Sequence, residues 1–190
     1  MKKLVLSVMI LMAVSACKKE STVVENTETD STAAVTVPES NEPTEAAVPF
    51  KKVEFSPEET TNLLANQKND TLYVTNFFAT WCGPCVKEIP HFKAKMAELK
   101  DQPVKFRFVS LDDPKDWAVT VPEFAAKHGL SQDVILLDGK QLTAEFFPAN
   151  FKEWDGGAIP FTFMRKGDKT DETLGMMSED MLSQKINSFK

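Results

Sequence analysis

Apolar and polar residues are arranged differently in three successive parts of the chain. Residues 4–14 form a nearly unbroken apolar run, whereas residues 18–49 show neither a helical nor a strand period and contain no aromatic side chain. From Phe50 onward, apolar residues recur at the spacings of helices and strands. The pattern predicts one folded domain over residues 50–190, preceded by two segments that have no hydrophobic core of their own.

The periodicity within this domain predicts alternating strands and helices. Strands are expected at 72–79, 104–111, 134–137 and 161–165, with a last strand that begins at 173–174. Helices are expected at 58–65, 83–99, 121–128 and from Ser178 to Phe189. An order of β-α-β-α-β followed by β-β-α is typical of an α/β fold in which helices flank a central mixed sheet.

The first sixteen residues have the layout of a secretory signal peptide. Lys2 and Lys3 precede the apolar run, and the small residues Ser15 and Ala16 follow it. A run of about 11 apolar residues is too short to span a bilayer as a helix. The segment Val-Ser-Ala-Cys that ends at Cys17 resembles a bacterial lipobox, which implies acylation of this cysteine. We therefore expect a lipid-anchored, periplasm-facing envelope protein, on either membrane, with a plain signal peptide as the alternative.

Residues 17–49 are predicted to be a disordered acidic tether between the membrane and the domain. They carry two lysines against seven acidic residues and are rich in Ser, Thr, Glu and Pro. The whole chain has a net charge of −6 and a pI near 5.1. Because nucleic-acid binding normally leaves a basic footprint, this balance argues against a nucleic-acid partner.

The densest chemical motif is the run Trp81-Cys82-Gly83-Pro84-Cys85, which lies between a predicted strand and a predicted helix. Unpaired N–H groups and the dipole at a helix start stabilise a thiolate, so Cys82 is predicted to be the exposed nucleophile. Cys85 follows one turn later and is predicted to be the more buried resolving thiol of a redox-active Cys82–Cys85 disulfide. Pro84 suits the first turn of a helix, where its missing N–H costs little.

Two other interpretations of the cysteine pair were weighed. A zinc site would need two further ligands. The chain has only two histidines, His91 and His128, and no fourth cysteine. A purely structural disulfide would close a very small loop and constrain the unfolded chain little. We expect neither a metal nor a cofactor.

The run from Asn76 to Pro90, Asn-Phe-Phe-Ala-Thr-Trp-Cys-Gly-Pro-Cys-Val-Lys-Glu-Ile-Pro, resembles the TlpA/ResA branch of the thioredoxin superfamily. The resemblance implies a thioredoxin fold with an inserted βα segment, here within residues 112–157. It also implies that Pro160 is a cis-proline facing the dithiol and that Glu88 manages protons near the active site.

The residue types at two of these positions support the resemblance. Asn76 takes the place of the buried aspartate of ordinary thioredoxins, and a neutral amide cannot accept a proton from Cys85. Burial and a nearby thiolate would raise the pKa of Glu88 towards the working range of a base. The alternative for Glu88 is a solvated helix residue without a chemical role.

The resemblance further implies thiol–disulfide exchange on exported proteins, in the reducing direction, as in cytochrome c maturation. The expected partners are a disulfide-bearing protein client and a membrane electron donor. Two alternatives remain open at this point. One is an oxidase or isomerase that introduces disulfides, and the other is a tethered client-binding module whose dithiol serves as a redox latch.

Overall fold

The computed structural model describes residues 48–190 of the chain. The predicted signal peptide, Cys17 and the predicted tether up to residue 47 lie outside the described residues. Within residues 48–190, no helix combines the length and the apolar character that crossing a membrane requires.

Six strands and five α-helices make up this part of the chain. The strands are β1 (Glu54–Phe55), β2 (Leu72–Phe78), β3 (Val104–Ser110), β4 (Val134–Leu137), β5 (Phe161–Lys166) and β6 (Lys169–Leu174). The α-helices are α1 (Pro57–Leu64), α2 (Gly83–Glu98), α3 (Thr120–Lys127), α4 (Phe146–Asn150) and α5 (Glu179–Asn187). Two short 3₁₀ helices lie at Pro114–Asp116 and Gly139–Gln141.

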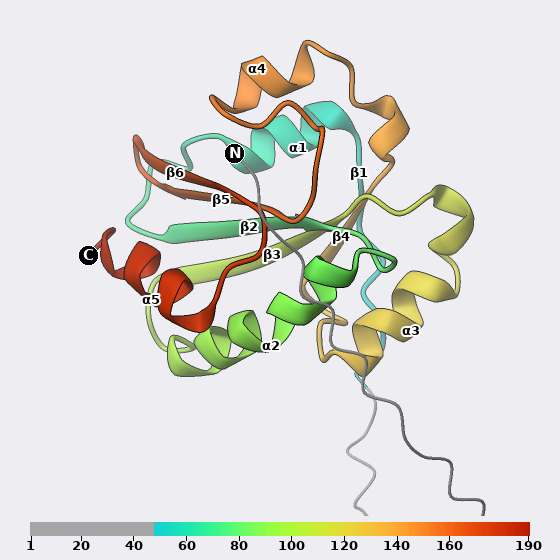
Figure 1. Cartoon of the computed structure of the whole chain (residues 1–190), viewed down its shortest axis with the longest axis horizontal. Helices are drawn as coiled ribbons and strands as arrows, with labels where there is room; N and C mark the ends of the chain where they lie inside the picture. Colours follow the sequence, from blue (N-terminus) through green and yellow to red (C-terminus); the bar gives the residue numbers. More distant parts are fainter. Residues whose placement is uncertain (1–47) are drawn as a thin grey trace, which may run out of the picture. The chain divides into compact units, whose positions relative to one another are not determined.

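The strands form one mixed sheet in the order β1-β4-β3-β2-β5-β6. The first four strands in this order run parallel, and β5 and β6 run antiparallel to their neighbours. Helices α1 and α4 lie on one side of the sheet, and α2, α3 and α5 lie on the other (Figure 1). The predicted α/β fold with a central mixed sheet flanked by helices is confirmed.

The central strand β2 is buried on both faces, as its almost unbroken apolar sequence requires. Val74 and Phe78 belong to the larger core cluster, beneath α2, α3 and α5. Phe77 belongs to a second cluster, beneath α1 and α4. The carboxyl end of β2 leads directly into the cysteine motif, so both cores hold that end of the strand in place.

The first helix begins one residue before the predicted start, with Ser56 as its N-cap. Ser56 Oγ accepts a hydrogen bond from the Glu59 backbone N–H at 3.2 Å, and the Glu59 carboxylate accepts one from the Ser56 N–H at 2.7 Å. These reciprocal bonds satisfy N–H groups that lack an intrahelical partner. Pro57 occupies the first turn, where no N–H is required.

Three elements differ from the prediction. The last strand, expected to begin at 173–174, spans Lys169–Leu174, because the turn at Gly167 returns the chain along the free edge of β5. Strand β1 has only two residues and was not predicted. Helix α4 was also not predicted, since five residues are too few to display a helical period.

Candidate active site

The cysteine motif forms the junction between β2 and α2. Cys82 is the N-cap of α2, and its Sγ accepts a hydrogen bond from the backbone N–H of Cys85 at 3.3 Å. Pro84 lies in the first turn of the helix. The Cys82 sulfur therefore sits at the positive end of the helix dipole, where a negative charge is stabilised.

Cys82 and Cys85 are joined by a disulfide, with their Cα atoms 5.3 Å apart. Cys82 is 5% exposed and Cys85 1% exposed. The order of exposure agrees with the predicted roles, but the prediction of an exposed Cys82 is wrong. The cause is local packing, because the loop before Pro160 lies across the sulfur while the neighbouring Trp81 is turned outward and is 72% exposed.

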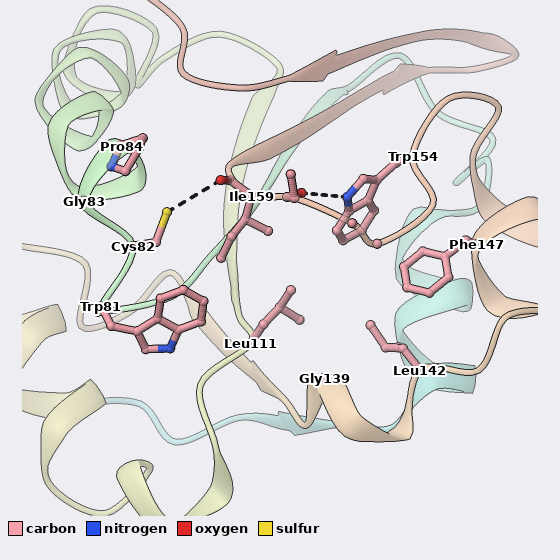
Figure 2. A pocket seen from close by; sticks show the side chains of 13 residues that line it. Trp81, Cys82, Gly83, Pro84, Leu111, Gly139, Leu142, Phe147, Trp154 and Ile159 are labelled. Atoms are coloured by element: carbon pink, nitrogen blue, oxygen red, sulfur yellow. Dashed lines mark hydrogen bonds between the residues drawn. The ribbon is translucent and has the colours of Figure 1, made fainter.

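The residue before the expected proline faces the disulfide. The Ile159–Pro160 peptide bond is cis, as the resemblance implied. The Ile159 carbonyl oxygen lies 3.8 Å from Cys82 Sγ, and Figure 2 shows this oxygen directed at the sulfur. In residues 48–190, no backbone hydrogen bond uses the Ile159 N–H. Ile159 thus offers a free backbone edge next to the sulfur.

Glu88 is fully buried beneath the dithiol, one helical turn after Cys85. Its Oε1 accepts a hydrogen bond from Asn76 Nδ2 at 2.8 Å, and its Oε2 accepts one from the Met177 N–H at 2.8 Å. Asn76 Nδ2 also donates to Thr162 Oγ1 at 3.0 Å. The alternative of a solvated Glu88 is therefore wrong. The direct contact of this acid with Asn76 was not predicted.

Burial raises the pKa of Glu88 to about 7 from an ordinary value of 4.5. The hydrogen bonds from Met177 and Asn76 favour the carboxylate and lower the pKa, as does the positive charge of His91, but the loss of solvent outweighs all three. A carboxyl group with this pKa exchanges its proton near neutral pH, which suits a base or an acid of the reaction.

A second buried carboxylate, Asp112, forms hydrogen bonds that hold the segment just before the cysteines. It accepts hydrogen bonds from the Thr80 N–H at 3.0 Å, from Thr80 Oγ1 at 2.6 Å and from Ser110 Oγ at 2.8 Å. This role of Asp112 was not predicted. The only signal in the sequence was its position at the carboxyl end of a strand that neighbours β2.

A pocket of about 540 Å³ opens beside Cys82. One wall is formed by Trp81 and Ile159, and the opposite wall comes from the segment around α4 (Figure 2). The lining residues are apolar, glycine, proline or cysteine: Trp81, Cys82, Gly83, Pro84, Leu111, Gly139, Leu142, Phe147, Trp154, Gly156, Gly157, Ala158 and Ile159. The predicted motif residues Trp81, Gly83 and Pro84 thus lie around the mouth of one cavity.

Trp154 belongs both to the second core cluster and to the pocket wall. Its side chain is 3% exposed and stacks on Phe161 with ring centroids 4.4 Å apart. Its indole edge also lines the pocket, and its Nε1–H donates to the Ala158 carbonyl at 2.9 Å. No group of three or more His, Cys, Asp or Glu side chains among residues 48–190 is arranged to hold a metal ion.

Comparison with known proteins identifies relatives over this same region. The profile of the AhpC/TSA family matches residues 45–170. The thiol-disulfide oxidoreductase ResA of Bacillus subtilis (strain 168) is 27% identical over 117 residues, covering 60% of this chain and 59% of the relative. ResA of Geobacillus kaustophilus (strain HTA426) is 26% identical over 117 residues, covering 60% of this chain and 61% of the relative. The chain therefore spans about three fifths of the length of these curated relatives.

Two further likenesses bear on the fold. A thioredoxin of Ictalurus punctatus is 31% identical over 122 residues, covering 64% of this chain and 82% of the relative. Among solved structures, a thiol:disulfide interchange protein of the thioredoxin family from Chlorobium tepidum TLS superimposes with a TM-score of 0.51 at 21% identity, covering 75% of this chain and 97% of the other. The superposition agrees with the fold described above.

Proposed function

Since this chain belongs to the AhpC/TSA family and carries the thioredoxin fold, we propose that it is a thiol–disulfide oxidoreductase that reduces disulfides in exported proteins. The observation that carries the proposal is the position of Cys82 Sγ at the start of α2, where it accepts the Cys85 N–H. A sulfur in this position is stabilised as a thiolate, and the thiolate is the form that attacks disulfides.

The proposed reaction transfers two electrons from the protein dithiol to the client. The Cys82 thiolate attacks one sulfur of the client disulfide, so that a Cys82–client bond forms while the client's own S–S bond breaks and its second sulfur leaves as a thiolate. The Cys85 sulfur then attacks Cys82, releasing the first client sulfur. The protein is left with the Cys82–Cys85 disulfide, and the two client thiolates take up protons.

Glu88 supplies the base for the second step. Cys85 must lose its proton before it attacks, and in this buried setting Asn76 cannot receive it. The Glu88 carboxylate, with its pKa raised to about 7 by burial, accepts the proton and passes it on as the client leaves. Pro160 completes the site, because a proline at this position leaves Ile159 as the residue whose backbone faces the client.

The remaining parts of the proposal concern the setting. A signal peptide over residues 1–16 and acylation at Cys17 would hold the domain at an envelope membrane, facing the periplasm, through the tether at 17–49. In that oxidising compartment a thiol reductant at the membrane must return the Cys82–Cys85 disulfide to the dithiol. Apocytochromes c, whose paired cysteines must be reduced before haem attachment, are the client class that the TlpA/ResA resemblance favours.

A trapping experiment tests the exchange reaction. In a Cys85→Ser variant the resolving thiol is lost, so mixed disulfides through Cys82 should accumulate and be visible on non-reducing gels. The Cys82→Ser variant is the matched control and should trap nothing. Clients that stay bound to both variants would instead indicate a binding module without exchange.

The reducing direction has its own test. The Gly-Pro pair between the cysteines favours a potential nearer the roughly −270 mV of thioredoxin than the roughly −120 mV of strong oxidants. Equilibration with glutathione or dithiothreitol buffers measures this value directly. A potential above about −180 mV would place the protein among isomerases and oxidases and end the reductase proposal.

A further inference from the structure

The pocket beside Cys82 is continuous with the reacting sulfur and carries no charged side chain in its lining. Its volume of about 540 Å³ falls in the range of about 300–1,000 Å³ that binding sites occupy. In Figure 2, the side chains of Leu142 and Phe147 lie across this space from Cys82, and Leu111 lies between them and Trp81. A group attached to the sulfur of Cys82 would therefore meet an apolar surface within a few bonds.

Packing contacts hold the pocket walls in place. The Phe147 ring lies against Gly156, where an added Cβ would come within 2.3 Å of the ring. Phe147 also makes an edge contact with Trp154, at 5.4 Å between ring centroids. Trp154 is in turn stacked on Phe161 of the sheet core. The cavity is thus preformed, and binding would not have to order its walls.

The loop before Pro160 limits how a client can dock. The Gly157 N–H is bound by Asp155 Oδ1 at 2.8 Å, and the Ala158 carbonyl is bound by Trp154 Nε1 at 2.9 Å. At Ile159, whose carbonyl oxygen lies 3.8 Å from Cys82 Sγ, no backbone hydrogen bond within residues 48–190 uses the N–H or the carbonyl, so both are available to a client strand. A client backbone paired at Ile159 passes next to Cys82, and its neighbouring side chains reach the pocket because successive residues of a strand lie about 3.4 Å apart.

We propose, on the basis of exchange at Cys82, that the client carries a bulky uncharged apolar residue within two positions of its reacting cysteine, and that this pocket binds its side chain. Aromatic and branched aliphatic side chains gain from leaving water for such a cavity. A charged side chain would lose its hydration without finding a partner in the lining.

A series of peptides tests the preference. Each peptide carries one intramolecular disulfide and differs only at a position next to, or two residues from, one cysteine, where Ala, Leu, Phe, Lys or Glu is placed. The protein is reduced, freed of reductant and mixed with each peptide, and acid-quenched samples are separated to follow reduced peptide. We expect second-order rate constants at least about tenfold higher for Phe and Leu than for Ala, and lowest for Lys and Glu.

Two variants test whether the pocket causes the preference. Leu142→Glu places a carboxylate in the lining, and Ala158→Glu places one at an exposed position of the same wall, where folding is not at risk. Both should lower the rate with the Phe peptide about tenfold and raise the rate with the Lys peptide. The matched control Met181→Glu changes an exposed apolar residue on α5, across the sheet from α4, and should leave the whole series unchanged.

The outcomes separate this inference from the proposed function. Cys82-dependent reduction of all peptides at similar rates would overturn the pocket assignment and leave the oxidoreductase proposal standing. A preference for apolar residues that both glutamate variants leave intact would also overturn it, because the preference would then arise elsewhere. A protein that reduces none of the peptides through Cys82 would overturn the proposed function itself.

Discussion

Two buried carboxylates stand near the dithiol, and their partners give them different tasks. Asp112 accepts bonds from Thr80 and Ser110 and so ties the segment before the cysteines to the end of β3. Glu88 accepts only from Asn76 and Met177, and burial raises its pKa to about 7. The first arrangement fixes geometry, whereas the second places a titratable proton beneath Cys85.

The raised pKa of Glu88 predicts how stability depends on pH. Between pH 4.5 and about 7 the unfolded chain has released this proton while the folded protein keeps it, so the free energy of unfolding falls as pH rises through this window. The stabilisation is complete below pH 4.5 and lost above about 7, and a shift of this size corresponds to roughly 3 kcal/mol. We expect the Glu88→Gln variant to lose this slope in urea unfolding of the disulfide form.

The difference between the pH profiles of the wild-type protein and the Glu88→Gln variant reports the contribution of Glu88. His128, whose pKa is lowered by burial, and Asp133, whose pKa is raised by burial, titrate alike in both. Parallel pH profiles for the wild-type protein and the Glu88→Gln variant would show that Glu88 does not retain its proton near neutral pH, and would remove the basis for its role as a base.

The hydrogen bonds to Asp112 predict a loss of stability when its carboxylate is removed. Asp112→Ala leaves the Thr80 N–H and the Ser110 hydroxyl without their buried acceptor, so we expect the free energy of unfolding to fall by about 2–4 kcal/mol in urea titration. The neighbouring Asp113→Ala is the matched control. It removes only surface ion pairs, with Lys140 and Lys115, and should cost less than about 1 kcal/mol. Equal losses of unfolding free energy in the two variants would contradict a stabilising role of the Asp112 hydrogen bonds.

At the scale of elements, the sequence predicted those whose pattern is local. Strand β4 has the predicted bounds, and α2 ends within one residue of them, because each has a continuous apolar or periodic run. Residues 169–172 of β6 are polar and show no apolar alternation. They become a strand only because the turn at Gly167 lays them along β5. Helix α4 depends likewise on packing from a distant part of the chain.

The candidate site likewise contains parts with a local sequence signal and parts that depend on distant residues. The cysteine pair could be predicted, because the motif lies between a strand and a helix with clear patterns. The resemblance to a known family added Glu88 and the cis-proline Pro160. The Thr80–Asp112 contact joins residues 32 positions apart and has no local signature. The pocket could not be predicted for the same reason, since its far wall comes from the segment around α4.

The packing of α4 on its following loop predicts an unequal effect of two glycine substitutions. Gly156 and Gly167 both have positive φ, 85° and 58°, but an added Cβ meets the Phe147 ring at Gly156 and nothing at Gly167. Gly167→Ala should therefore cost about 1–2 kcal/mol from the backbone alone. Gly156→Ala should cost about 1–3 kcal/mol more, because the Phe147 ring must move. Thermal or urea unfolding measures both, and equal costs would show that the ring yields freely.

At the scale of the whole molecule, the sheet and both core clusters lie within residues 48–190. Each edge of the sheet is poorly suited to pairing with another chain. Strand β1 has only two residues, and β6 carries Lys169, Asp171 and Glu172. Short and charged edge strands discourage association through the sheet, so the domain is built to act as a separate unit.

This self-containment predicts that a protein comprising residues 48–190 folds alone. Its melting temperature in the disulfide form should lie within about 2 °C of that of the full chain, since a change below roughly 0.5 kcal/mol shifts Tm by no more than that. Its rate of disulfide reduction with a soluble peptide should also match that of the full chain. A lower Tm or a slower rate would show that residues 1–47 contribute to the fold or to the site.

The internal hydrogen bonds of Gly157 and Ala158 have a consequence for turnover. With the Gly157 N–H and the Ala158 carbonyl already engaged by Asp155 and Trp154, a client finds fewer free backbone partners on this loop. A client held by few backbone hydrogen bonds and one side chain in the pocket has a short residence time once the covalent link is cut, because rapid dissociation accompanies weak binding. The finished product should therefore leave without blocking the next cycle, and long-lived complexes should exist only while a sulfur–sulfur bond holds them.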